Sequence, residues 1–266
     1  MPTEKRQRQK EGRAARQAAL EAYRRKSARR RQLITMVVII ALVFLVVALI
    51  SRGGNDDTVT AGATTTTTAP TPTTLPPAKG DSKVCPAVDG SSARATEFEA
   101  PPATCIDPAK TYTAKFDTDV GSFTVALDAI KAPKTVNNFV FLARYHFFDG
   151  SLFHRVIPGF VVQGGDANKG DGTGDAGYKI PDEFPQQGEF KVGSVAMANS
   201  GQPNSGGTQF FVIVGEQGLT LPPSYTLFGA VTEGIEVAHT IEKDGESGNG
   251  TPKVFHQIIK VTITEV

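Results

Sequence analysis

The sequence lacks the residue patterns of several common chemistries. Its only cysteines, Cys85 and Cys105, form no CxxC motif and have no histidine near them, which argues against metal or redox chemistry at a thiol. No G-x-S-x-G elbow is present to make a serine nucleophile. Asp166, Asp171 and Asp175 are spaced loosely like a calcium loop, but no glutamate closes it at the required position. We therefore expect neither a metal nor another cofactor.

Charge is also absent from one long apolar run near the N-terminus. Residues 33–50, LITMVVIIALVFLVVALI, are 18 residues without a charge, in which only Thr35 is polar. At about 1.5 Å of rise per residue this run is close to the minimum length of a transmembrane helix, and we predict that it is one. The alternative, a buried core helix, is less favoured because such a helix rarely lacks a polar side. The following sequence ALISRGG is a poor cleavage site for a signal peptide.

Basic residues lie mainly on one side of this run. Residues 1–32 carry 12 Lys and Arg against 3 Asp and Glu, a net charge of +9, so the other 234 residues carry −8 of the formal total of +1. The positive-inside rule then predicts a cytoplasmic N-terminus on a cell membrane crossed once, with residues 51–266 outside. Such a basic segment could bind nucleic acid, but its position beside the span favours anionic lipid, and we expect no nucleic-acid partner.

Two segments separate the predicted span from the folded body. Residues 51–84 are rich in Thr, Pro, Ala and Gly, which cannot bury enough apolar surface to become ordered, so we predict a disordered linker. Residues 85–108 form an N-terminal extension that begins at Cys85. Because the extension would lie outside the cytoplasm, we predict a structural disulfide between Cys85 and Cys105, which stabilises by roughly 3 kcal/mol in the chain-entropy model.

The remaining body, residues 109–266, alternates short apolar runs with turn residues. Eight runs have the period of strands: 111–118, 121–128, 152–157, 160–165, 193–198, 208–215, 225–232 and 257–265. Residues 132–145 and 234–243 have the helical period instead, and Pro133 suits the first turn of the former. Eight strands and two helices predict a mainly β fold, a closed antiparallel barrel whose ends the helices cover.

Four stretches of this body resemble the cyclophilin family of peptidyl-prolyl cis/trans isomerases. They are, in order, APKTVNNFVFLARYHFFDG, FHRVIPGFVVQGGD, MANSGQPNSGGTQFFVIV and YTLFGAVTEG, and the likeness covers about residues 109–266. The family's fold is an eight-stranded antiparallel barrel capped by two helices, in agreement with the independent strand count. The resemblance implies isomerisation of X–Pro bonds. With the predicted span, it indicates a membrane-anchored bacterial enzyme that assists the folding of exported proteins by acting on their Pro-containing segments.

The resemblance implies that Arg155 is the catalytic residue. An X–Pro amide resists rotation by about 18–20 kcal/mol because its C–N bond has double-bond character. A hydrogen bond from a guanidinium toward the imide nitrogen would weaken that resonance selectively in the transition state, with no bond made or broken. Because arginine stays protonated at any physiological pH, activity is expected to vary little with pH.

The resemblance also implies a substrate-binding site around this arginine. Apolar members hold the proline ring, and polar members place the arginine and the substrate backbone. The matching residues are Phe160, Val161, Gln163, Ala198, Asn199, Gln209, Phe211, Leu221 and Tyr225. Ala198 and Asn199 would pair with the substrate backbone as if adding a strand.

Three positions depart from the family pattern. Thr220 stands where the best-known eukaryotic cyclophilins have a tryptophan, and this chain has no tryptophan at all. Tyr225 stands where they have a rim histidine, and Asp175 replaces a glycine usual in the GTGG loop. The first two departures resemble bacterial members, and they predict weak cyclosporin binding rather than loss of isomerase activity.

Other interpretations of these residues are open at this point. Arg155 could be a strand residue in a salt bridge. Phe160 and Phe211 could belong to the barrel core, since alternation alone does not distinguish a pocket face from an interior face. We expect His154 to be structural. The domain as a whole could be a non-catalytic scaffold or chaperone that is tethered to the membrane and docks Pro-containing segments.

Overall fold

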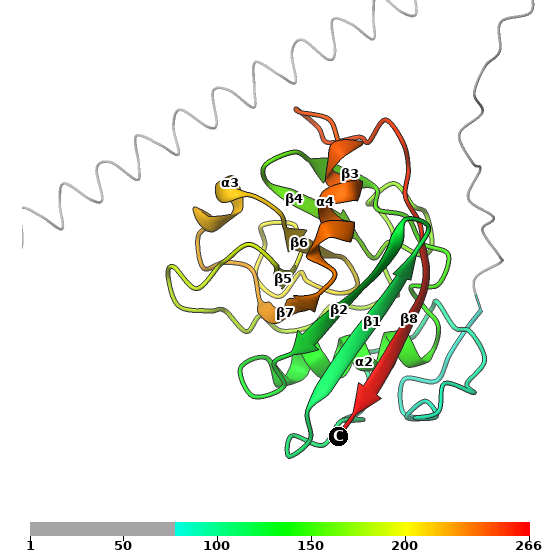
Figure 1. Ribbon diagram of the computed structural model, residues 1–266. Helices are drawn as coiled ribbons and strands as arrows, with labels where there is room; N and C mark the ends of the chain where they lie inside the picture. Colours follow the sequence, from blue (N-terminus) through cyan, green and yellow to red (C-terminus); the bar gives the residue numbers. More distant parts are fainter. Residues whose placement is uncertain (1–77) are drawn as a thin grey trace, which may run out of the picture. The chain divides into compact units, whose positions relative to one another are not determined.

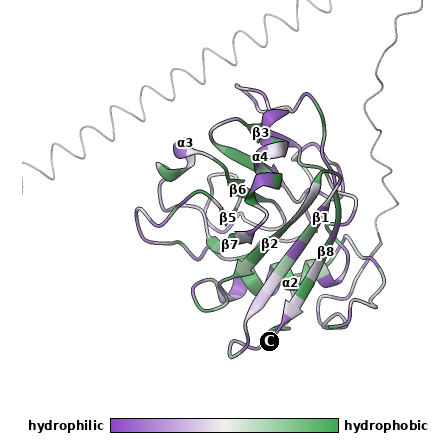
Figure 2. Ribbon diagram, viewed as in Figure 1, coloured by the Kyte–Doolittle hydropathy of each residue, from purple (hydrophilic) through white to green (hydrophobic). Residues whose placement is uncertain are grey.

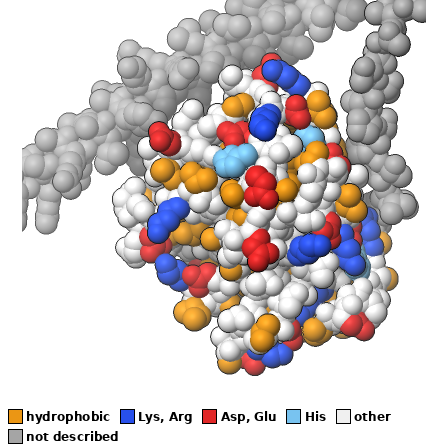
Figure 3. Space-filling model, viewed as in Figure 1, with side chains coloured by type: hydrophobic (Ala, Val, Ile, Leu, Met, Phe, Trp, Pro, Cys, Tyr) orange, Lys and Arg blue, Asp and Glu red, His pale blue; other side chains and the backbone are white. Residues whose placement is uncertain are grey.

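The computed structural model describes residues 78–266 of the chain (Figure 1). The predictions for residues 1–32, for the span 33–50 and for linker residues 51–77 fall outside the described residues. Within residues 78–266, no helix combines the length and apolar character needed to cross a membrane. On the face drawn in Figure 3, Lys and Arg side chains are interspersed with Asp and Glu.

Residues 78–266 contain eight strands, one at each predicted run, and only β7 extends beyond its run, by one residue. They are β1 (Tyr112–Thr118), β2 (Gly121–Leu127), β3 (Arg155–Ile157), β4 (Val161–Gly164), β5 (Ser194–Met197), β6 (Phe210–Ile213), β7 (Leu227–Glu233) and β8 (Ile258–Glu265). The alternation of buried and exposed residues is clearest in β1, and Figure 2 shows the matching bands of hydropathy. The strand prediction is therefore confirmed in number and in place.

The strands form one antiparallel sheet in the order β3-β4-β6-β5-β7-β2-β1-β8. This sheet is an open half-barrel with β3 and β8 at its edges, so the predicted closed barrel is wrong. The physical reason lies at the outer edge of β3, which residues 246–250 occupy: the N–H of Val156 donates to the carbonyl of Gly250 at 2.7 Å, and the carbonyl of Val156 accepts the N–H of Glu246 at 3.1 Å. The two edges of the sheet meet around the start of β8, where the N–H of Ile258 donates to the carbonyl of Ser151 at 2.8 Å.

Within residues 78–266, both helices predicted for the body are present, together with a third that was not predicted. They are α2 (Pro133–Arg144) and α4 (Ile235–Lys243), with the short α3 (Glu216–Leu219) between β6 and β7. Helix α2 packs against β8, and α4 packs against β2, β3 and β4. Pro133 begins α2, but Ala132 before it makes no side-chain cap. Glu183 compensates, because its carboxylate accepts the N–H of Thr135 at 2.8 Å, where the helix dipole favours negative charge.

Phenylalanine side chains supply much of the main core. The ring of Phe116 from β1 stacks on that of Phe123 from β2 with centroids 4.6 Å apart. The ring of Phe139 from α2 stacks on that of Phe148 at 4.9 Å and meets the edge of Phe210 from β6 at 5.8 Å. Such offset and edge-to-face pairs add specific attraction to the burial of apolar area. They fix the helix against the sheet.

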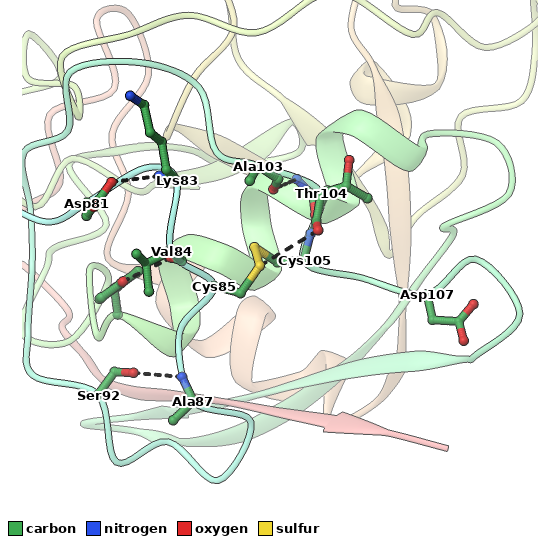
Figure 4. Close-up of a disulfide and its surroundings, with 12 residues drawn as sticks. Asp81, Lys83, Val84, Cys85, Ala87, Ser92, Ala103, Thr104, Cys105 and Asp107 are labelled. Atoms are coloured by element: carbon green, nitrogen blue, oxygen red, sulfur yellow. Dashed lines mark hydrogen bonds between the residues drawn. A yellow bond between two sulfur atoms is a disulfide. The ribbon is translucent and has the colours of Figure 1, made fainter.

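The extension that precedes β1 is joined by a disulfide and lies against α2. Cys85 and Cys105 are bonded (Figure 4), which confirms the predicted pairing. Asn137 of α2 is buried under this segment, and its amide donates to the carbonyl of Ala103 at 2.9 Å while accepting the N–H of Cys105 at 2.7 Å. The extension is thus fixed at one end by covalent and hydrogen bonds.

A buried histidine links three distant segments of the fold. The Nδ1 of His256 lies 2.9 Å from a carboxylate oxygen of Asp119, in the β1–β2 turn. Its Nε2 lies 2.9 Å from a carboxylate oxygen of Asp244, just after α4. Burial lowers the pKa of His256, but hydrogen bonds to Asp244 and Asp119 raise it further than burial lowers it, so the pKa of His256 is raised overall.

This raised pKa predicts a pH-dependent contribution to stability. A histidine whose folded pKa exceeds its unfolded value stabilises the fold most below about pH 6.5 and loses that contribution as pH rises through the folded pKa. We expect His256→Gln to be less stable than the parent chain in mildly acid solution, with the difference shrinking toward alkaline pH. Thermal unfolding at a series of pH values measures this difference.

The matched control is His239→Gln, since His239 lies 2.8 Å from Glu242 but has a side chain 41% exposed. It is expected to change stability little at any pH. Burial lowers the pKa of His154, so its contribution to stability changes with pH in the opposite direction. Because His154 is present in the parent and in both variants, this contribution cancels when their stabilities are compared. A parent–variant difference that stays constant across the series would contradict the role of His256.

Candidate active site

The strand register brings three predicted site residues into one row. Arg155 on β3 pairs with Gln163 on β4, Gln163 pairs with Phe211 on β6, and Phe211 pairs with Ala196 on β5. Residues that are directly opposite in antiparallel strands project from the same face of a sheet. The sheet therefore places a cation, an amide and an aromatic ring side by side.

This face carries an apolar cluster that is separate from the main core. Its buried members are Val161, Phe190, Ala196, Phe211 and Ile213, with Phe160, Ala198, Leu221, Tyr225 and Leu227 half-buried against them. All six apolar or aromatic residues predicted for the site fall in this cluster. The rings of Phe211 and Tyr225 meet edge to face at 5.5 Å. Phe160 and Phe211 thus lie outside the main core, and the half-buried members leave the cluster open to solvent.

A chain of polar side chains runs beside the apolar cluster. An Nη1–H of Arg155 donates to Oε1 of Gln163 at 3.1 Å, and Nε2 of Gln163 donates to Oε1 of Gln209 at 3.1 Å. Nε2 of Gln209 then donates to the carbonyls of Gly172 at 2.9 Å and Gly174 at 3.1 Å. Each side chain in this chain donates to the next acceptor, which fixes the orientation of both amides.

Arg155 is held between this chain and an aromatic ring. Its guanidinium carbon lies 5.8 Å from the centroid of the Phe160 ring, within the range of a cation–π contact. No carboxylate of residues 78–266 forms an ion pair with it. Within the described residues, the salt-bridge interpretation of Arg155 therefore has no support.

Two clefts adjoin the polar chain. The smaller, of about 250 Å³, is lined by Gln163, Ala198, Asn199 and Gln209 among others, so it brings four predicted residues together. Arg155 is not in its lining and reaches it through Gln163. The larger cleft, of about 510 Å³, lies between the extension and the loop of residues 166–177. The amide of Asn199 donates to the carbonyl of Ser224 at 2.8 Å, which ties the cleft wall to the segment before β7.

The loop of residues 166–177 is organised around one buried carboxylate. One oxygen of Asp166 accepts the N–H groups of Gly172 at 2.8 Å and Gly174 at 3.0 Å. The other oxygen accepts the N–H of Lys169 at 2.9 Å. Burial raises the pKa of Asp166, but the backbone N–H groups lower it more, so the net shift of this pKa is downward. The neighbouring acid Asp175 pairs with Lys179 at 2.9 Å instead, and within residues 78–266 no cluster of acidic, His or Cys side chains is arranged to hold a metal ion.

His154 is packed beneath this loop. Its side chain is buried, and neither ring nitrogen has a hydrogen-bond partner in residues 78–266. Burial lowers its pKa, with Asp166 opposing the shift. Gly172 lies directly above it at φ +87°, and a Cβ there would come within 3.0 Å of the imidazole. The ring is thus packed against the loop, and the close contact together with the positive φ favours glycine at position 172.

Several residues of the apolar cluster and of the smaller cleft were not predicted. Ala196 could have been predicted, because alternation within residues 193–198 puts it on the same face as Ala198. Thr173 lines the smaller cleft from the loop of residues 166–177, where no period identifies a face, and Thr208 lines it from just before β6. Thr220, the position of one family departure, is exposed at the end of α3.

Comparison with known proteins finds a family model and several proteins that are similar in sequence to this chain. Residues 113–263 match the family model described as cyclophilin type peptidyl-prolyl cis-trans isomerase/CLD. The peptidyl-prolyl cis-trans isomerase A of Mycobacterium tuberculosis is 41% identical over 175 residues, which cover 59% of this chain and 94% of that protein. Peptidyl-prolyl cis-trans isomerase-like 3 of Gallus gallus is 43% identical over 130 residues, covering 47% of this chain and 79% of that protein.

Solved structures agree with the sequence matches. A cyclophilin type peptidyl-prolyl cis-trans isomerase of Cryptosporidium parvum superposes with a TM-score of 0.52 at 27% identity, covering 58% of this chain and 98% of that chain. The same protein was also solved in the presence of the dipeptide Ala-Pro, with a TM-score of 0.52 at 29% identity, covering 57% of this chain and 98% of that one.

The role of Asp166 can be tested without reference to activity. Asp166→Asn replaces an oxygen that accepts N–H groups with an amide that cannot, and we expect it to lower the free energy of unfolding by about 1–3 kcal/mol. Hydrogen exchange at the amides of Gly172 and Gly174 should accelerate by more than the global change. Asp171→Asn is the matched control, because Asp171 is exposed and its carboxylate accepts bonds only from Thr173 among the described residues. Equal exchange in the two variants would contradict the role of Asp166.

Proposed function

This chain belongs to the cyclophilin-type family of peptidyl-prolyl cis-trans isomerases, which bind proline-containing peptides, and from that premise we propose that Arg155 is its catalytic residue. The observation that carries the proposal is the position of the guanidinium. It stands at the edge of the apolar cluster, hydrogen-bonded to Gln163 at 3.1 Å and beside the ring of Phe160. A donor in this position is available to a proline amide whose ring occupies the cluster.

In the proposed mechanism, one set of residues binds the substrate and another promotes rotation about the X–Pro bond. The half-buried rings of Phe160 and Tyr225, with Phe211 behind them, hold the proline ring by apolar contact. Ala198 and Asn199 hold the backbone of the flanking residues along the edge of the smaller cleft. A guanidinium N–H of Arg155 then donates toward the imide nitrogen as it becomes pyramidal, which weakens amide resonance only in the rotated state. No covalent bond forms or breaks.

Gln163 has a positioning role in this proposal. Because arginine has no acceptor, it can bind Gln163 only through the amide oxygen, and that bond directs one branch of the guanidinium. The other branch remains for the substrate. That a relative was solved in the presence of the dipeptide Ala-Pro agrees with an X–Pro unit as the substrate proposed here.

We also propose where the enzyme works. Residues 33–50 would anchor the chain, residues 1–32 would stay in the cytoplasm, and residues 51–84 would tether the extension 85–108 and the isomerase domain 109–266 outside. The Cys85–Cys105 disulfide supports this arrangement, since such bonds persist in oxidising compartments. The clients would then be exported proteins with slow proline steps in folding.

A protease-accessibility experiment tests this topology. In bacterial cells whose outer layers have been removed and whose cell membrane is intact, we expect added protease to remove the isomerase domain. A cytoplasmic marker protein should survive. An N-terminal epitope tag should become accessible only after the membrane is permeabilised. Survival of the isomerase domain in unpermeabilised cells would contradict the proposed orientation.

The catalytic role is tested by replacing the arginine. In a protease-coupled assay with a proline peptide, Arg155→Ala is expected to lower kcat/KM on the order of a hundredfold or more, mainly through kcat, because the lost donor acts in the transition state. Arg155→Lys is the matched control: it keeps the charge but loses the planar fork that binds Gln163, so we expect only partial activity. Cyclosporin should inhibit the parent weakly in the same assay. An Arg155→Ala enzyme as active as the parent would overturn the mechanism.

A further inference from the structure

The extension holds the outer side of the loop of residues 166–177. The side-chain amide of Asn168, in this loop, donates to the carbonyl of Thr96 in the extension at 2.9 Å and to the carbonyl of Asp175 at 2.6 Å. The N–H of Phe98 in the extension donates to the carbonyl of Ala176 at 2.8 Å. The loop is therefore attached to the extension at two points that lie on either side of the residues facing the active site.

The attachment is rigid because Phe98 is itself anchored. Its side chain is 4% exposed, and its ring lies 4.9 Å from Phe141 and 5.4 Å from Tyr145, which form the end of α2 and the residue after it. The N–H of Ala95 donates to the carbonyl of Tyr145 at 2.9 Å. The Cys85–Cys105 disulfide closes the segment of chain that contains these residues.

The opposite side of the loop meets the active site through its carbonyls. Gly172 and Gly174 present the two acceptors that receive Nε2 of Gln209. Because Arg155 can only donate, Gln163 must turn its oxygen toward it and its NH2 toward Gln209. Gln209 must then present its oxygen to Gln163, and its own NH2 requires acceptors elsewhere. The two glycine carbonyls are those acceptors, so they complete the direction of hydrogen bonding that Arg155 imposes.

We infer that Thr96, Phe98 and Asn168 are positioning residues for the isomerase: they hold the loop so that its carbonyls orient Gln209 and, through Gln163, the guanidinium of Arg155. This inference rests on the proposed catalytic role of Arg155. It assigns the disulfide-closed extension a part in catalysis, in addition to stabilising the fold. Asp166 holds the same loop from inside, so the question for experiment is whether that inner contact suffices without the outer one.

The test compares two asparagines that both bind the extension backbone. Asn168→Ala removes the bonds to Thr96 and Asp175. Asn137→Ala is the matched control, because Asn137 binds Ala103 and Cys105 at the far end of the extension and does not touch the loop. In the full-length chain we expect Asn168→Ala to lower kcat/KM by about 5- to 30-fold, mainly through kcat, a range typical of coupling between sites. Asn137→Ala should stay within about twofold of the parent, although it loses stability.

A second readout reports the polar chain directly. In nitrogen-labelled protein, the side-chain NH2 resonances of Gln163 and Gln209 should shift or broaden in Asn168→Ala and keep their positions in Asn137→Ala. A merely structural role would move these resonances and the activity to the same extent in both variants. If Asn168→Ala does not fold, Phe98→Leu takes its place, since it keeps the backbone bond to Ala176 and trims only the aromatic anchor.

The outcomes separate this inference from the proposed function. If Arg155→Ala inactivates the enzyme while Asn168→Ala keeps the parental kcat and glutamine resonances, the inference is overturned and the proposed function stands. If Arg155→Ala stays active while the glutamine resonances move in Asn168→Ala, the loop positions the polar chain but the chain does not carry catalysis, and the proposed function fails. Equal losses in Asn168→Ala and Asn137→Ala would also overturn the inference.

Discussion

Arginine can donate hydrogen bonds but cannot accept them, and this asymmetry determines the arrangement of the site. The bond of 3.1 Å from Arg155 to Gln163 forces the amide of Gln163 into one orientation, which in turn forces that of Gln209. The last donor of the chain then needs carbonyl acceptors, and the loop around Asp166 supplies them. The carboxylate of Asp166 in turn accepts hydrogen bonds from backbone N–H groups that the tight loop would otherwise leave without partners. One donor at β3 thus requires an ordered loop more than ten residues away.

The second face of the sheet makes this arrangement accessible to a polypeptide. One face forms the main core with α2, while the row from Arg155 through Gln163 to Phe211 lies on the other face, which carries the second apolar cluster. Half-buried members give that cluster an exposed edge, which a closed and fully packed interior would lack. The fold therefore separates the apolar contacts that hold the protein together from those available to a ligand.

Periodicity and motif predicted different parts of this structure. The period of two located all eight strands, and the helical period located α2 and α4, because burial of one face controls both patterns. The motif gathered Phe160, Phe211 and Tyr225 into one site, which alternation alone could not do. Closure of the barrel was predicted wrongly, since the strand count does not reveal that residues 246–250 occupy the outer edge of β3. Contacts made by turns, such as Glu183 at the start of α2 and Asp166 in the loop, have no period and depend on tertiary structure.

The central claim is that the guanidinium of Arg155 accelerates rotation about an X–Pro bond and does more than dock proline. Exchange spectroscopy by NMR on a proline peptide mixed with the full-length chain measures this most directly, because it reports binding and cis/trans interconversion separately. We expect the parent to speed interconversion well above the uncatalysed rate, and Arg155→Ala to bind the peptide but interconvert it slowly. Rapid interconversion by Arg155→Ala, or binding without acceleration by the parent, would contradict this claim.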